Sequence, residues 1–217
     1  MNFQFTLLFL RLRYGPRMSI SLDNGSEFVA KTIKNVALDK HEMVSVVFDA
    51  CEFKDCHFGS AVFTRCKFVD CVFVECNLSN AKIAGSKFLN AEFSHCKMIG
   101  INWPEATWLS IAASPQLTFW NSNLNDSSFF GLKLHEMVIQ NCTAHSVDFR
   151  AADLTRADLT GTDLQESLFG KTILIEADLS GATNYNIDVL DNNVRKARFS
   201  RHEALGLLSG FDIELVD

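Results

Sequence analysis

The sequence has little proline, no long apolar segment and no surplus of basic charge. Only 3 of its 217 residues are proline and 47% are hydrophobic, which excludes a collagen-like or disordered chain and predicts one or two packed domains. No apolar run approaches the roughly 18 to 20 residues that a bilayer span requires, so we expect no membrane association. The net charge of −6 argues against direct binding of nucleic acid through its phosphates.

The amino terminus lacks the features of a secretory signal. Residues 3–10 are the most apolar stretch, but no basic residue precedes them, Arg11 and Arg13 follow them, and no clear cleavage site is present. We therefore expect a cytoplasmic protein. Met18 is an alternative to Met1 as the true start, because the repeat pattern begins just after it.

Recognisable catalytic and metal-binding patterns are also missing. The seven cysteines are spaced 5, 10, 5, 5, 20 and 46 residues apart, whereas zinc sites use pairs about two to four residues apart. His-Glu pairs occur without the second histidine of a zinc protease, and the Gly-x-Ser-x-Gly motif is absent from the sequence. We therefore expect no metal, no cofactor and no enzymatic activity.

What the sequence does contain is a period of five residues. Large apolar residues recur at every fifth position from Phe28 to Trp108 and again, one residue out of phase, from Phe119 to Leu179; only Ala144 is small. The position two residues earlier is small or β-branched over long stretches and holds all seven cysteines, which we expect to be buried and structural. A period of five fits neither an α-helix nor a strand and predicts a solenoid.

Segments such as residues 152–156, 157–161 and 177–181 resemble the Ala-(Asp/Asn)-Leu-x-x signature of pentapeptide-repeat proteins. The resemblance covers residues 26–183 and implies an all-β solenoid, a right-handed quadrilateral β-helix with one pentapeptide per side and four per coil. The central residue and the one two before it would point inward. Thirty repeats would give about 7.5 coils and a height of about 36 Å.

The repeat divides the chain into three parts. Residues 1–25 are expected to form an N-terminal extension and the start of a cap, residues 26–183 the β-helix, and residues 184–217 a C-terminal cap. A one-residue register break falls within residues 109–118. If one residue is inserted there, centres twenty apart form a wholly aromatic column, which favours one continuous tower, with a loop of changed coil phase as the alternative. The column would contain Phe28, Phe48, Phe68, Phe88, Trp108, Phe129, Phe149 and Phe169.

The C-terminal cap is expected to contain a short helix and a strand. Ser200 and Glu203 are placed as in a capping box, and Gly210 is a plausible end of the helix. Alternation from Phe211 to Leu215 predicts a short strand. The family resemblance implies that such C-terminal elements join two rods end to end, so we expect a homodimer, with a monomeric cap as the alternative. The residues assigned to the cap and the dimer contact are Leu205, Leu208, Phe211, Ile213 and Leu215.

Negative charge is concentrated in the C-terminal part of the chain. Residues 126–217 carry 15 acidic and 8 basic side chains, against 11 and 9 in residues 18–125. Five aspartates directly precede central residues and are expected to project from successive sides: Asp148, Asp153, Asp158, Asp163 and Asp178. They either belong to the repeat, where Asp favours turns and solubility, or present the charge of duplex DNA to a protein with a basic groove.

The repeats, the length and the acidic balance resemble the quinolone-resistance (Qnr) and MfpA group of the family. The resemblance implies a protein partner, DNA gyrase or topoisomerase IV, bound through the five aspartates, and quinolone resistance as the result. The chain departs from that group in its short interruption and in the lysines on the outer surface of its N-terminal half. The alternative is a scaffold β-helix that binds some other partner.

Overall fold

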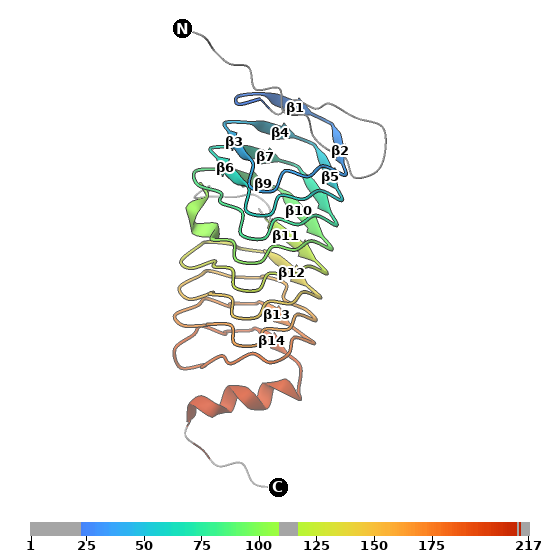
Figure 1. Cartoon of the computed structure of the whole chain (residues 1–217). Helices are drawn as coiled ribbons and strands as arrows, with labels where there is room; N and C mark the ends of the chain where they lie inside the picture. Colours follow the sequence, from blue (N-terminus) through green and yellow to red (C-terminus); the bar gives the residue numbers. More distant parts are fainter. Residues whose placement is uncertain (1–22, 109–116, 212, 214–217) are drawn as a thin grey trace.

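Parallel pairing between residues one coil apart stacks the chain into a rod (Figure 1). The computed structural model describes residues 23–108, 117–211 and 213. Strand partners such as Phe28 and Phe48, or Phe48 and Phe68, lie 20 residues apart along the chain, so each coil takes four pentapeptides. The stack of about eight coils confirms the predicted all-β solenoid.

Four ladders of parallel pairs define four faces, which we number in chain order. Face 1 contains β1 (Glu27–Val29), β4 (Val47–Asp49), β7 (Lys67–Val69) and β9 (Lys87–Leu89). Face 2 contains β2 (Thr32–Lys34), β5 (Glu52–Lys54), β8 (Val72–Val74), β10 (Ala91–Ser94), β11 (Leu117–Trp120), β12 (Val138–Gln140), β13 (Asp178–Leu179) and β14 (Arg198–Phe199). Face 3 consists of single bridges such as Asn123 with Thr143. Face 4 begins with β3 (Glu42–Val44) and β6 (Val62–Thr64) and continues through bridges such as Ser128 with Asp148.

The central residue of each pentapeptide points into the rod, as the period predicts. Phe68 is 2% exposed, and its ring stacks on Phe48 and Phe88 with centroids 5.2 and 5.0 Å apart. Stacking of equivalent residues therefore produces continuous apolar columns. All seven cysteines are buried and free, which confirms the inward position predicted for them.

The inward residue two before each centre also bonds one coil to another. Ser122 accepts a hydrogen bond from the N–H of Cys96 at 3.0 Å, and its hydroxyl donates to the carbonyl of Trp120 at 2.8 Å. Ser86 does the same between the N–H of Cys66 and the carbonyl of Phe63. These side chains satisfy buried backbone groups that would otherwise destabilise the core.

The strand pairs correct the predicted one-residue insertion. Phe93 in β10 pairs with Phe119 in β11, 26 residues away instead of 20, so the coil holds six additional residues. Trp103, in the 3-10 helix η1 (Trp103–Glu105), then stacks on Phe129 with centroids 5.8 Å apart. The predicted wholly aromatic column is therefore wrong: its members up to Trp108 lie on face 1, whereas those from Phe129 onward lie on face 4. The ladder is continuous across the break, and residues 109–116 lie outside the described part of the chain.

The coils continue beyond residue 183, where the repeat signature fades. β13 pairs with β14, so Phe199 still stands in the ladder. The predicted short helix follows as the 3-10 helix η2 (Glu203–Phe211), which closes the end of the rod (Figure 1). The Ser200 hydroxyl accepts the N–H of Gly181 at 2.6 Å and so ties the start of η2 to the previous coil. Most of the predicted strand after Phe211 lies outside the described residues. Within the described residues, the helices are all too short or too polar to cross a membrane.

The aromatic columns predict a large penalty for truncating a central ring. Phe68→Ala should lower the free energy of unfolding by about 3 to 5 kcal/mol, because it leaves a cavity between Phe48 and Phe88. Chemical denaturation measures the change. The matched control is Phe130→Ala, whose ring is 51% exposed and whose loss should cost less than about 0.5 kcal/mol. Equal effects of the two substitutions would contradict the inward assignment.

The inward hydroxyls predict a cost that reflects hydrogen bonding and not volume. Ser122→Ala should destabilise the rod by about 1 to 3 kcal/mol, because the buried N–H of Cys96 loses its acceptor. Ser94→Ala, at a half-buried position in β10, serves as the control and should have little effect. Amide hydrogen exchange should also locate faster exchange at Cys96, and unchanged exchange there would refute the assignment.

Candidate functional site

The five predicted aspartates are distributed around the whole circumference of the rod. Asp148 lies on face 4 and Asp153 on face 1, paired with Ser128 and Lys133 of the preceding coil. Asp158 and Asp178 lie on face 2, and Asp163 lies on face 3. The structure therefore does not bring these five carboxylates together on one surface.

Each of these aspartates stabilises the turn at a corner of the rod, where the chain passes from one face to the next. One carboxylate oxygen accepts the backbone N–H two residues later, at distances between 2.9 and 3.2 Å. The donors are Arg150, Thr155, Thr160, Gln165 and Ser180. This side-chain turn stabilises the chain where it leaves the strand. Asn77 and Asn123 make the same bond, so the turn requires an oxygen acceptor and not a charge.

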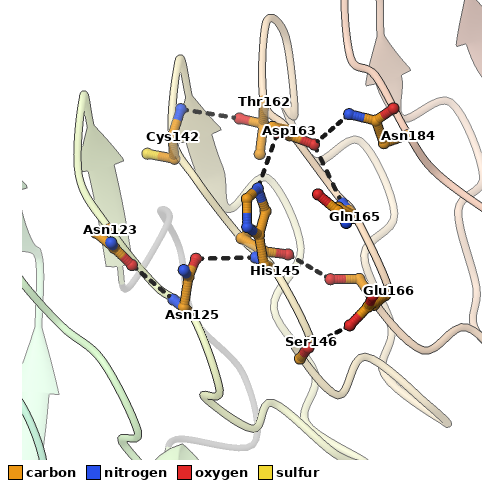
Figure 2. Close-up of polar contacts among 12 residues, drawn as sticks. Asn123, Asn125, Cys142, His145, Ser146, Thr162, Asp163, Gln165, Glu166 and Asn184 are labelled. Carbon is orange, nitrogen blue, oxygen red and sulfur yellow. Dashed lines mark hydrogen bonds and ion pairs between the residues drawn. The ribbon is translucent and has the colours of Figure 1, made fainter.

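The second carboxylate oxygen often contacts a neighbouring coil. On face 3, this second oxygen of Asp163 accepts a hydrogen bond from His145 at 2.8 Å, as Figure 2 shows. Asn184 donates at 2.8 Å to the other oxygen, which also accepts the turn N–H of Gln165. The equivalent contacts are His135 with Asp153 at 2.7 Å on face 1 and Gln140 with Asp158 at 2.6 Å on face 2. On three of the four faces, an equivalent hydrogen bond between residues 18 apart in the chain therefore joins the same two coils.

Four of the five carboxylates have a lowered pKa and are ionised at neutral pH: Asp148, Asp153, Asp163 and Asp178. The Arg150 guanidinium, held at 2.9 and 2.8 Å by two hydrogen bonds, lowers the pKa of Asp148. Burial raises the pKa of Asp153 and of Asp163, but hydrogen bonds to each carboxylate outweigh it and the net shift is downward.

Net charge in the C-terminal half lies on one side of the rod. Within residues 117–183, the pentapeptides of faces 2 and 3 contain no Lys or Arg in the sequence. Their acidic residues, which we call the acidic side, are Asp126, Asp158, Asp163, Glu166 and Asp178. One cation from the following coil reaches it, since Arg198 pairs with Asp178 at 2.7 Å. Asp126 and Glu166 were not among the predicted site residues, because they stand at corners and not before a centre.

The opposite side, faces 4 and 1, is balanced over the same residues. Its acidic residues are Glu136, Asp148, Asp153 and Glu176, and its basic residues are Lys133, Arg150, Arg156 and Lys171. Several of these form ion pairs, including Arg156 with Glu136 at 2.8 Å and Arg150 with Asp148 at 2.8 Å. We call this the neutral side. Sorting residues 117–183 into columns twenty apart would have found the asymmetry, because this part of the chain contains no further break.

The C-terminal end of the rod exposes apolar side chains. Leu205, Phe211 and Ile213 are 57%, 46% and 55% exposed, whereas Leu208 is half-buried. Leu215, the fifth residue assigned to the dimer contact, lies outside the described residues. Among the side chains that the structure describes, three or more His, Cys, Asp or Glu never gather closely enough to hold a metal ion.

Comparisons with known proteins agree with this architecture. A sequence model of the pentapeptide repeat region matches residues 46–113, and one of pentapeptide repeats (8 copies) matches residues 152–183. A search of curated proteins gives no match. Two solved structures of QnrB1, a plasmid-mediated fluoroquinolone resistance protein, are each 18% identical to this chain. The trypsin-treated form has a TM-score of 0.64 and covers 88% of this chain and 98% of its own. The full-length form has a TM-score of 0.58 and covers 87% and 100%. At this identity, the likeness establishes the fold.

The Arg150 contact predicts a pH-dependent contribution to stability. Arg150→Gln should raise the pKa of Asp148, measured by carboxyl NMR titration, and should slightly destabilise the rod at pH 7. Because the folded pKa of Asp148 lies below its unfolded value of about 3.9, the difference should persist above that pH. It should disappear as the pH falls through the folded pKa. Lys171→Gln, a cation one coil further along, is the control and should leave the Asp148 titration unchanged.

Proposed function

Because this chain belongs to the pentapeptide-repeat family, we propose that it acts by binding another protein and not by catalysis. The partner we propose is a type II topoisomerase, DNA gyrase or topoisomerase IV, in the cytoplasm. The observation that carries the proposal is the acidic side, five carboxylates without a Lys or Arg in residues 117–183 of faces 2 and 3. A groove that binds DNA is lined with cations, and such a surface complements it.

The density of charge on the acidic side is comparable with that of duplex DNA. The carboxylates span about three steps between coils, or about 14 Å at about 4.8 Å per step. B-DNA carries one charge per about 1.7 Å, so about eight phosphates occupy that length and about four face one side. The acidic side presents five. The same field repels phosphates, which supports a protein partner and argues against direct binding of nucleic acid.

QnrB1, whose solved structures share this fold, is described as a fluoroquinolone resistance protein. We extend that role to this chain as part of the proposal: by occupying the DNA-binding groove, the rod would protect the topoisomerase from the drug. The rival candidate is a scaffold rod with a different partner. It is favoured by the turn-forming role of the aspartates, because that role accounts for their place in the repeat without any partner.

We also propose that two rods associate through their C-terminal ends. The exposed Leu205, Phe211 and Ile213 would lose contact with water in such a dimer. Leu208 and Leu215 complete the assigned contact. Sedimentation equilibrium of the full chain, alone and with Leu205→Ser, measures the association. A monomer at all concentrations would refute the dimer and leave the topoisomerase proposal intact.

The asymmetry of charge gives a matched test of the proposed function. The acidic-side variant carries Asp126→Asn, Asp158→Asn, Asp163→Asn, Glu166→Gln and Asp178→Asn. The neutral-side variant carries Glu136→Gln, Asp153→Asn and Glu176→Gln and keeps Asp148, which orients Arg150. Both should fold, because Asn keeps the oxygen that the corner turn requires. Binding to purified gyrase, and protection of its supercoiling activity from a fluoroquinolone, should fall at least tenfold in the acidic-side variant.

The neutral-side variant removes three negative charges from the opposite side of the rod and should bind within about threefold of the native chain. The affinity of the native chain should also fall as salt rises, since exposed charges act over about 10 Å at 0.1 M salt. Equal losses in the two variants would refute a directional site. If the native chain does not bind gyrase, the scaffold function takes the place of this one.

A further inference from the structure

Face 4 of the C-terminal half exposes apolar side chains on three of four successive coils. Phe130, Leu168 and Leu190 are 51%, 47% and 67% exposed, and we call these three residues the apolar patch. The bridges Ser128 with Asp148 and Asp148 with Leu168 place the coils of Phe130 and Leu168 on either side of the coil of Asp148. Leu190 follows one coil beyond Leu168. Exposed side chains of this size contribute little to folding, and their grouping indicates a contact with another molecule.

A fixed arginine lies at the centre of the patch. The Arg150 guanidinium lies 5.9 Å from the centroid of the Phe130 ring. Two hydrogen bonds to Asp148, at 2.9 and 2.8 Å, set the orientation of the guanidinium plane. Aromatic and arginine side chains are often the residues that contribute most to the binding energy of protein interfaces. Because Arg150 is already ordered by Asp148, its side chain would lose little conformational entropy when a partner binds.

The size of the patch indicates what can cover it. Three steps between coils give a height of about 14 Å, and one face is about 12 Å wide, so the patch alone offers far less than the roughly 800 Å² per partner of a stable interface. A second copy docked on face 4 alone would therefore bind weakly. The patch does border the acidic side, since Glu166 is two residues from Leu168 in the sequence and Asp126 is four residues from Phe130. Faces 2, 3 and 4 together form one larger continuous surface.

We infer that the apolar patch is the part of the partner-binding surface that distinguishes this rod from DNA. Its occupant is a protein whose cationic groove covers faces 2 and 3 and whose apolar wall packs on Phe130, Leu168 and Leu190. Charge complementarity selects the groove, because faces 2 and 3 carry only negative charge in residues 117–183. Duplex DNA bound in the same groove would present no exposed apolar side chains to that wall. This inference rests on the proposed function and adds a contact that is insensitive to salt.

The experiment measures gyrase binding of the full chain at about 0.1 M and about 0.4 M salt. The test variant carries Phe130→Ser and Leu168→Ser, and the control carries Val29→Ser, which alters a residue 52% exposed on face 1. The test variant should lose at least tenfold in affinity at both salt concentrations and keep the salt dependence of the native chain. The acidic-side variant should instead lose most of its salt dependence. Thermal melting should show that the variants remain folded.

The outcomes separate this inference from the proposed function. If the acidic-side variant loses affinity and the test variant does not, the apolar contact is refuted and the proposed function stands. If the test variant changes the sedimentation of the chain alone, the occupant is a second copy and the inference is refuted. If the native chain does not bind gyrase, both are refuted.

Discussion

Backbone hydrogen bonds between residues one coil apart hold every other feature of the rod in position. The N–H of Ala30 donates to the carbonyl of Asp49, and the N–H of Val47 donates to the carbonyl of Ser26. Such in-register bonding places each residue directly over its equivalent in the next coil, so a column of rings, of thiols or of carboxylates arises wherever the sequence repeats a residue type. The side-chain bonds between coils, such as Cys96 to Ser122, occupy the gaps that the ladder leaves at the corners.

The period of five predicts the direction of each side chain but not the face on which it lies. An insertion of one residue and an insertion of six give the same shift in a pattern of period five, so Phe119 could be placed within its pentapeptide but not around the rod. The pairing of Phe119 with Phe93 and the stacking of Trp103 on Phe129 decide between them. The error changed the alignment between the columns before and after the break, but it did not change the columns within residues 117–183. The turn bonds of the aspartates were anticipated as a general property of Asp, whereas the contacts of Asp163 with His145 and Asn184 depend on side-chain conformations that the period does not specify.

The two sides of the C-terminal half illustrate how one repeat serves two requirements. On the neutral side, Glu136 and Arg156, or Glu176 and Lys196, stand one above the other and compensate each other. On the acidic side, Gln140 and Asn184 bind the carboxylates of Asp158 and Asp163 without adding a charge, and Arg198 of the following coil pairs with Asp178. Like charges on adjacent coils repel each other and lower stability. Their retention on one side is consistent with a surface shaped by an external contact.

The coil length of twenty residues also limits how a rod of this kind varies in evolution. Duplication of a single pentapeptide would rotate everything that follows by a quarter turn and move Asp163 from face 3 to face 4. Duplication of four would lengthen the rod by about 4.8 Å and keep every side chain at its place on the circumference. The six additional residues between Phe93 and Phe119 leave the order of faces intact. The length of the rod and the pattern on its surface can therefore change independently, because the insertion of a whole coil leaves the acidic side at the same position on the circumference.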